Sequence, residues 1–282
     1  MIGVDPDGNA LKSVAYELKE KGYNVGIMTN NPVNHATPAC FYANSKSRYS
    51  YYDICRQLAE SGFDYFAGSG FYQFRGKDGD QPSVQGYIEE QGYTVCYGTE
   101  EFNARNKEAE KVIFIQESGR EADPEYYVSD GEEECDIKIS KMLEMGLEVL
   151  GDEEPFFIMC EGGEIDWAGH SNLTMPMIDA VIKFDDAIAV AYEFYKQHPE
   201  ETLIVVTADH ETGGLSIPSN KTDFTLAESG IGYAFGTSSH TATMVPVYLY
   251  GTGANLIEGV MENSELGQKV QELLGLNEQK KK

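Results

Sequence analysis

Short apolar runs alternate with longer amphipathic segments along most of the chain. Runs such as Leu203-Ile-Val-Val206 are apolar throughout, which is typical of strands buried on both faces of a parallel sheet. Between such runs, apolar residues recur every three or four positions, as in helices that bury one face. The predicted strands are 23–28, 63–67, 94–97, 112–115, 156–159, 203–206 and 245–250, and the predicted helices are 9–21, 51–61, 137–150, 175–197 and 254–274. The alternation predicts an α/β fold, a three-layer α/β/α sandwich with a mostly parallel central sheet.

The longest predicted helix, 175–197, carries an apolar stripe that we expect to be buried. Thr174 is its expected N-cap residue, and Pro176 falls in the first turn, where proline is tolerated. The stripe consists of residues spaced three or four apart: Met177, Val181, Phe184, Ile188, Ala191 and Tyr195. This periodicity indicates a core helix and not a cofactor-binding segment.

The region 68–136 interrupts this pattern, because it is irregular and rich in glycine, tyrosine and glutamate. We expect a single domain over 1–282 with an irregular insertion at about 68–136, over or beside the carboxyl edge of the sheet. The acidic stretch Asp130-Gly-Glu-Glu-Glu134 is interpreted as a solvated loop, with a calcium site as the alternative.

The composition limits the possible partners. At 282 residues the chain is long enough for one large α/β domain or two small ones. Its formal net charge of −26 argues against nucleic acids and anionic membranes as partners, because both would be repelled. An anionic substrate would need metal ions or a local arginine to reverse the field. No apolar segment approaches the length of a membrane span, and residues 1–15 lack the blocks of a signal peptide.

The cysteines predict neither a disulfide framework nor a structural zinc site. There are five of them, an odd number, and they are widely spaced without a CxxC pair. Cys40, Cys55 and Cys160 are interpreted as small buried apolar residues.

Candidate metal ligands form a first cluster directly after the predicted strand 156–159. Asp166 and His170 lie four positions apart, so one helical turn or a tight loop could direct both toward one ion. Zinc favours such nitrogen and carboxylate ligands, whereas Glu161 at the strand end is a hard oxygen donor better suited to magnesium. Gly162 and Gly163 would let the backbone come close to a bound group. The alternative is an ordinary polar loop with a surface histidine.

A second cluster follows the predicted strand 203–206. Asp209 and His210 come directly after this buried run, where open α/β sheets place their ligands. His240 supplies a further imidazole before another predicted strand, whereas His198 precedes Pro199 at a helix end and is expected to face solvent. Ligands drawn from separate strand ends indicate an enzyme site.

Four segments together resemble the alkaline phosphatase family. They are Asn24-Val-Gly-Ile-Met-Thr-Asn-Asn-Pro-Val-Asn-His-Ala-Thr-Pro-Ala39, Glu161-Gly-Gly-Glu-Ile-Asp166 with His170, Val205-Val-Thr-Ala-Asp-His210, and His240-Thr241. They occur in the family's order, and the likeness runs from about Val4 to the final predicted helix, which is most of the chain. The resemblance implies an alkaline phosphatase-like fold and the metal-dependent hydrolysis of phosphate monoesters.

The resemblance also assigns roles to individual residues. It implies a first zinc on Asp166, His170 and His240, a second zinc on Asp209 and His210, magnesium on Glu161 and Thr37, and phosphate binding by Arg48. Two cations close together can stabilise both oxygens of an in-line displacement, and a planar guanidinium suits phosphate better than a lysine does.

Two further residues are assigned to the surroundings of this site by resemblance. His35 falls near the magnesium position, where it would influence the choice of metal; the alternative is a loop histidine with satisfied hydrogen bonds. Trp167, the only tryptophan, follows a zinc ligand and is expected on the pocket wall.

The family pattern also reveals an absence. Alkaline phosphatases carry a serine nucleophile after an aspartate, and an earlier aspartate that bridges the second zinc and magnesium; the sequence contains neither Asp-Ser-Ala nor Asp-Gly-Met. We therefore expect the chain to be a truncated, nearly inactive part of a parent phosphatase. The family implies a periplasmic or secreted parent that acts on small phosphomonoesters and can form a homodimer.

Two other classes stay open. A phosphodiesterase, a sulfatase or a phosphoglycerate mutase of the same superfamily would reuse the ligand set, although Thr37 and the position of Arg48 favour the monoesterase. A non-catalytic metal-binding remnant is the second alternative.

Overall fold

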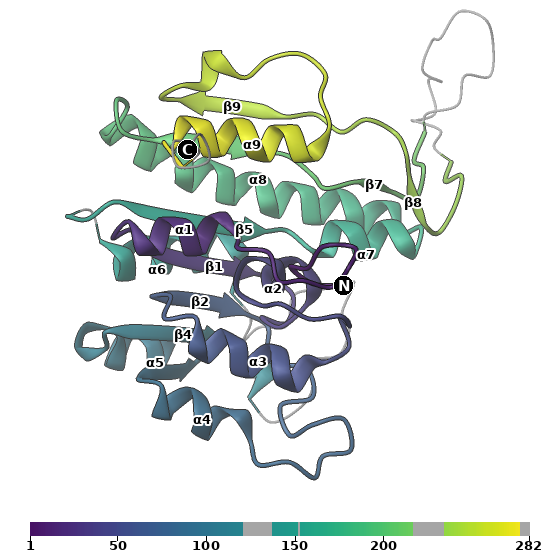
Figure 1. The fold of residues 1–282 in the computed structure, drawn as a ribbon. Coiled ribbons are helices and arrows are strands. Elements are labelled where there is room, and N and C mark those ends of the chain that lie inside the picture. The colour runs from purple at the N-terminus through teal and green to yellow at the C-terminus, as the bar shows by residue number, and fades with distance from the viewer. Residues whose placement is uncertain (121–136, 152, 217–233, 277–282) are drawn as a thin grey trace, which may run out of the picture. The chain divides into compact units, whose positions relative to one another are not determined.

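The computed structural model describes residues 1–120, 137–151, 153–216 and 234–276 (Figure 1). The described chain forms two compact units, the first ending at Gly163 and the second beginning at Glu164. The acidic stretch from Asp130 to Glu134, a loop or calcium site in the sequence interpretation, lies outside the described residues.

The first unit contains a five-stranded, entirely parallel sheet in the order β3-β4-β2-β1-β5. Its strands are β1 (Asn24–Thr29), β2 (Tyr65–Gly68), β3 (Tyr93–Tyr97), β4 (Lys111–Ile115) and β5 (Phe156–Glu161). The prediction of an α/β fold with a mostly parallel central sheet is confirmed for this unit. Two of the strands, β3 and β4, lie within the region 68–136 and match the strands predicted there at 94–97 and 112–115.

Helices cover both faces of this sheet (Figure 1). The helices of the unit are α1 (Val14–Glu20), α2 (Ala36–Tyr42), α3 (Tyr51–Glu60), α4 (Val84–Glu90), α5 (Gly98–Arg105) and α6 (Ile139–Leu150), with 3-10 turns at Asn106–Glu108 and Glu117–Gly119. On one face, Ile54 and Leu58 of α3 share a core with Ile27 of β1. On the other face, Tyr65 of β2 donates a hydrogen bond to the Met142 carbonyl of α6 (3.0 Å). The result is the three-layer arrangement that the apolar strands require.

Gly68, which ends β2, packs closely against the loop that follows β1. A Cβ atom on Gly68 would lie 2.6 Å from Val33 Cγ1 and 2.7 Å from the Asn31 carbonyl oxygen. We therefore expect Gly68→Ala to destabilise the protein by about 1–3 kcal/mol, because the clash involves backbone that leads into α2. Urea denaturation measures the effect. Gly86→Ala is the matched control, because Gly86 is exposed in α4 and a Cβ atom there meets nothing within 4 Å. An equal effect of both substitutions would contradict the close approach.

The second unit is built around the longest helix, α8 (Thr174–Gln197), which packs against α7 (Glu164–His170) and β6 (Leu203–Val206). Strand β6 pairs antiparallel with β9 (Tyr248–Gly251), and β7 (Glu211–Thr212) pairs with β8 (His240–Thr241). A 3-10 turn at Ala254–Leu256 and helix α9 (Asn263–Leu273) follow. None of the helices in the described part of the chain is long and apolar enough to cross a membrane.

Several local predictions were wrong in this unit. The predicted helix 254–274 is interrupted, and Gly259 has a left-handed φ of +91° that a helix does not accommodate. The predicted strand at 245 begins only at Tyr248, beyond Pro246, which cannot donate a ladder hydrogen bond. His198 does not simply face solvent, because it is half-buried with its ring 4.5 Å from that of Phe194.

The longest helix also differs from its prediction. Leu173, not Thr174, is the N-cap residue, and Thr174 is the first, buried residue of α8. The expected stripe is only partly buried, and Val181 is 48% exposed. The most buried helix interior positions are Ala180 and Ala187, where small side chains allow close packing.

Differences in the first unit are smaller. Helix α1 begins only at Val14, because Ser13 caps it by accepting a hydrogen bond from the Tyr16 amide. Of the cysteines expected to be buried, Cys55 is buried, Cys40 is exposed and Cys160 is half-buried.

Candidate metal centre

Helix α7 presents two of the predicted zinc ligands on one face. Asp166 and His170 are one helical turn apart, and Asp166 Oδ1 lies 3.5 Å from His170 Nε2. Both side chains are roughly one-third exposed. The structure therefore realises the helical-turn alternative for this pair and not the loop.

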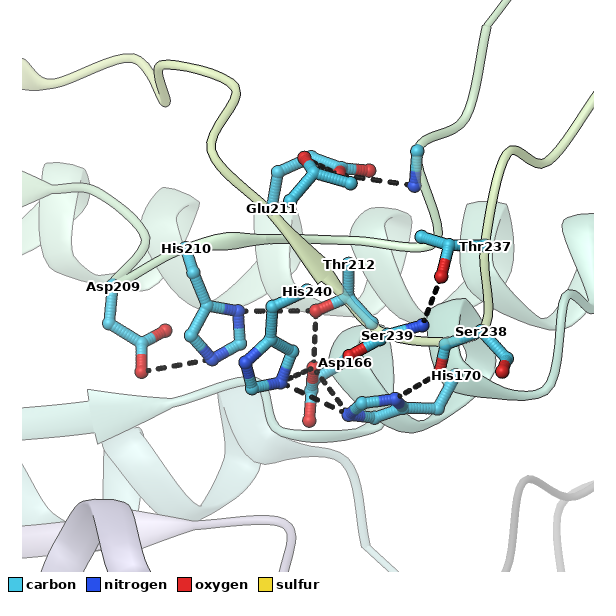
Figure 2. A network of polar contacts seen from close by, with 12 residues as sticks. Asp166, His170, Asp209, His210, Glu211, Thr212, Thr237, Ser238, Ser239 and His240 are labelled. Atoms are coloured by element: carbon cyan, nitrogen blue, oxygen red, sulfur yellow. Dashed lines mark hydrogen bonds and ion pairs between the residues drawn. The ribbon is translucent and has the colours of Figure 1, made fainter.

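Strand β8 brings the third predicted ligand to the same point (Figure 2). His240 Nε2 lies 3.1 Å from His170 Nε2 and 3.7 Å from Asp166 Oδ1. The ligand atoms of these three residues all lie within 4.8 Å of one another. Among the described residues, this is the one such group of histidine, cysteine and carboxylate side chains.

The donor set fits a zinc ion. Tetrahedral coordination at about 2.0–2.1 Å places neighbouring ligand atoms about 3.3 Å apart, close to the separations of 3.1, 3.5 and 3.7 Å found here. His170 Nδ1 lies 2.8 Å from the Ser238 carbonyl oxygen, which can only accept a hydrogen bond. The proton therefore resides on Nδ1, and Nε2 presents its lone pair to the other two ligands, as in metal-binding histidines.

Asp209 and His210 lie beside this group. His210 Nε2 is 3.4 Å from Asp209 Oδ2, and the His210 ring stacks on that of His240 with centroids 3.5 Å apart. The Asp209 side chain is 70% exposed. The pair offers one nitrogen and one carboxylate next to the first group (Figure 2), and its assignment to a second zinc stays a prediction.

The first unit holds the other predicted site residues. Glu161 and Thr29 end adjacent strands in register, and the Thr29 hydroxyl donates a 2.6 Å hydrogen bond to Glu161 Oε2. Thr37 lies in the first turn of α2. Its joint assignment with Glu161 to magnesium stays a prediction.

The predicted phosphate-binding arginine contacts His35. Arg48 Nη2 lies 2.9 Å from His35 Nε2, and because a guanidinium only donates, His35 Nε2 accepts. His35 is 7% exposed and is the N-cap residue of α2. The contact gives His35 a direct partner in the Arg48 guanidinium. Trp167, half-buried in α7, directly follows Asp166, and its place on a pocket wall stays a prediction.

Cys160, next to Glu161 in β5, is not equipped to act as a nucleophile. Although the residue as a whole is half-buried, burial of its sulfur raises the pKa of the thiol to about 12, and the negative charge of Glu161 adds to the shift. The thiol is therefore neutral even at alkaline pH.

Sequence reasoning missed three contributors: the hydroxyls of Thr29 and Thr212 and the Ser238 carbonyl. Thr29 carried a signal, because it is the polar residue that ends a buried strand. Thr212 lies two positions after His210, and this spacing by itself does not identify a functional residue. The Ser238 carbonyl is a backbone group and has no signal in the sequence.

The chain combines a parallel α/β unit with a carboxylate–histidine group that could hold a metal ion. These two features together are typical of metal-binding α/β proteins. The family model described as Alkaline phosphatase matches residues 1–67 and 120–229. The chain belongs to the alkaline phosphatase family.

Known relatives support this assignment. Alkaline phosphatase 4 of Bacillus subtilis is 31% identical over an alignment of 229 residues, which covers 78% of this chain and 47% of that protein. The solved alkaline phosphatase of the Antarctic bacterium TAB5 is 32% identical, with a TM-score of 0.84 over 98% of this chain and 79% of that one. A histidine-to-aspartate variant of that enzyme, solved with Mg bound in its M3 site, has a TM-score of 0.85 at 31% identity, over 98% of this chain and 79% of that one. The chain spans about half the length of the curated relatives it matches.

Proposed function

We propose that the full-length protein hydrolyses phosphate monoesters with two zinc ions and one magnesium ion. The convergence of Asp166, His170 and His240 on one point, with Asp209 and His210 beside it, is the observation that carries the proposal. Family membership supplies the type of reaction.

The second unit would hold the zinc ions. The first would bind to Asp166, His170 and His240, and the second to Asp209 and His210. Bound there, zinc supplies Lewis acidity toward the attacking and leaving oxygens of the ester. The protein's part is to hold the ligands: Ser238 fixes His170, and the β7–β8 pairing fixes His240 next to Thr212.

The first unit would supply the remaining groups. Arg48 would donate paired hydrogen bonds to two phosphate oxygens, which a planar guanidinium matches in geometry. Glu161 and Thr37 would contribute oxygens to magnesium, with Thr29 orienting the Glu161 carboxylate. His35 would hold Arg48 through the 2.9 Å contact.

The chain itself would have little activity, since its sequence contains no Asp-Ser-Ala motif for a covalent intermediate. We expect its turnover of p-nitrophenyl phosphate to be at least about 1,000-fold slower than that of a form extended with the family's serine-bearing segment. Steady-state assays with zinc and magnesium at alkaline pH measure the difference. Similar turnover by both forms would contradict the role assigned to the serine.

The same assay separates the candidate substrates. The extended form should prefer p-nitrophenyl phosphate to bis-p-nitrophenyl phosphate and to p-nitrophenyl sulfate. Preference for the diester or the sulfate would replace the monoesterase proposal with another hydrolase of the superfamily. A periplasmic or secreted location and a homodimer belong to the same proposal, supported by family membership alone.

A further inference from the structure

One hydroxyl group lies between the two parts of the metal centre. Thr212 Oγ1 is 2.5 Å from Asp166 Oδ1 and 3.2 Å from His210 Nδ1 (Figure 2). Asp166 belongs to the first proposed zinc site and His210 to the second. Thr212 therefore contacts one ligand of each.

The directions of these hydrogen bonds follow from the partners. A carboxylate only accepts, so the Thr212 hydroxyl donates its proton to Asp166. The hydroxyl oxygen then accepts from His210 Nδ1–H, which leaves His210 Nε2 as the unprotonated nitrogen. Nε2 is the nitrogen that lies 3.4 Å from Asp209 Oδ2. One hydroxyl thus orients the Asp166 carboxylate and selects the His210 tautomer that can bind a metal.

The backbone holds Thr212 firmly in place. It pairs with His240, the third ligand, in the β7–β8 ladder. Helix α7 packs directly on it, because a Cβ atom on Gly169 would lie 2.9 Å from the Thr212 carbonyl oxygen and 3.1 Å from its Cβ. The position of the hydroxyl is therefore set by the same elements that carry the ligands.

We propose that Thr212 is a positioning residue that couples the two zinc sites, orienting Asp166 for one and His210 for the other. This rests on the proposed function, because it presupposes that these residues bind zinc. Removing a group that orients a metal ligand typically lowers metal affinity by about 10–100-fold.

The test compares variants with and without the hydroxyl. Thr212→Val keeps the branched shape and removes the hydroxyl, whereas Thr212→Ser keeps the hydroxyl. Zinc affinity is measured by competition with a chromophoric chelator, and the visible spectrum of the Co²⁺-loaded chain reports the coordination geometry. Thr207→Val is the matched control, because Thr207 donates to the Pro246 carbonyl and to neither Asp166 nor His210.

We expect Thr212→Val to lower zinc affinity by about 10–100-fold and to alter the Co²⁺ spectrum. Thr212→Ser and Thr207→Val should behave like the original chain. If Thr212→Val fails to fold by circular dichroism, Thr212→Ala provides a smaller hydroxyl-free variant for the same measurement. Unchanged affinity and spectrum in a folded hydroxyl-free variant would overturn the proposal. Absence of zinc binding by the original chain would instead overturn the proposed function.

Discussion

Replacing His170 with alanine is expected to lower the zinc affinity of the proposed first site by more than about 100-fold. The loss should exceed the 10–100-fold effect typical of outer partners, because a direct ligand is removed. His170 Nε2 is also the atom that joins the other two ligands, 3.1 Å from His240 Nε2 and 3.5 Å from Asp166 Oδ1. Isothermal titration calorimetry or chelator competition measures the change.

His198→Ala is the matched control for this experiment. His198 lies in the same unit, at the end of α8, and stacks on Phe194. It belongs to none of the candidate ligand sets, so its replacement should leave zinc affinity unchanged. Equal losses in both variants would show that zinc binds histidines nonspecifically, contrary to the assigned site.

The second large effect concerns the stability of the first unit. Phe66→Ala should lower the free energy of unfolding by about 3–5 kcal/mol, as expected when a fully buried aromatic side chain is truncated. Phe66 is 0% exposed in the centre of the sheet. Its ring meets Tyr42 edge-on at 5.4 Å, and Phe63 and Tyr93 at 6.1 Å each. The substitution removes all three ring contacts and leaves a cavity.

Urea denaturation followed by far-ultraviolet circular dichroism measures this loss. Hydrogen exchange of the β2 amides assigns it to the first unit. Tyr49→Ala is the control, because Tyr49 is 71% exposed and its replacement should change stability by less than about 0.5 kcal/mol. A similarly small effect of Phe66→Ala would contradict a tightly packed core around β2.

The parallel sheet could be predicted because its strands are short apolar runs separated by helical periodicity. Strand β4, predicted at 112–115, was found at Lys111–Ile115. Predictions of burial were less accurate where the spacing of apolar residues did not show which side of a helix is packed. The apolar spacing of α8 does not reveal which of its faces the described neighbours cover, so Val181 was expected to be buried but is exposed.

The metal centre was only partly predictable for a related reason. The four-residue spacing of Asp166 and His170 allows a shared helical face or a tight loop, and the structure shows the helical face. His240, 70 positions beyond His170, cannot be paired with it by spacing, and the family resemblance supplied that assignment. The contacts of the Thr212 hydroxyl and the Ser238 carbonyl are defined only by the folded chain.

X-ray absorption spectroscopy at the zinc edge, on the chain loaded with one equivalent of zinc, tests whether Asp166, His170 and His240 bind the metal. We expect nitrogen and oxygen ligands at about 2.0–2.1 Å, with the outer-shell scattering of the two imidazoles of His170 and His240. That scattering should weaken by half in His170→Ala. A sulfur shell at about 2.3 Å, or a first shell without imidazole, would contradict the assignment of Asp166, His170 and His240 as the zinc ligands.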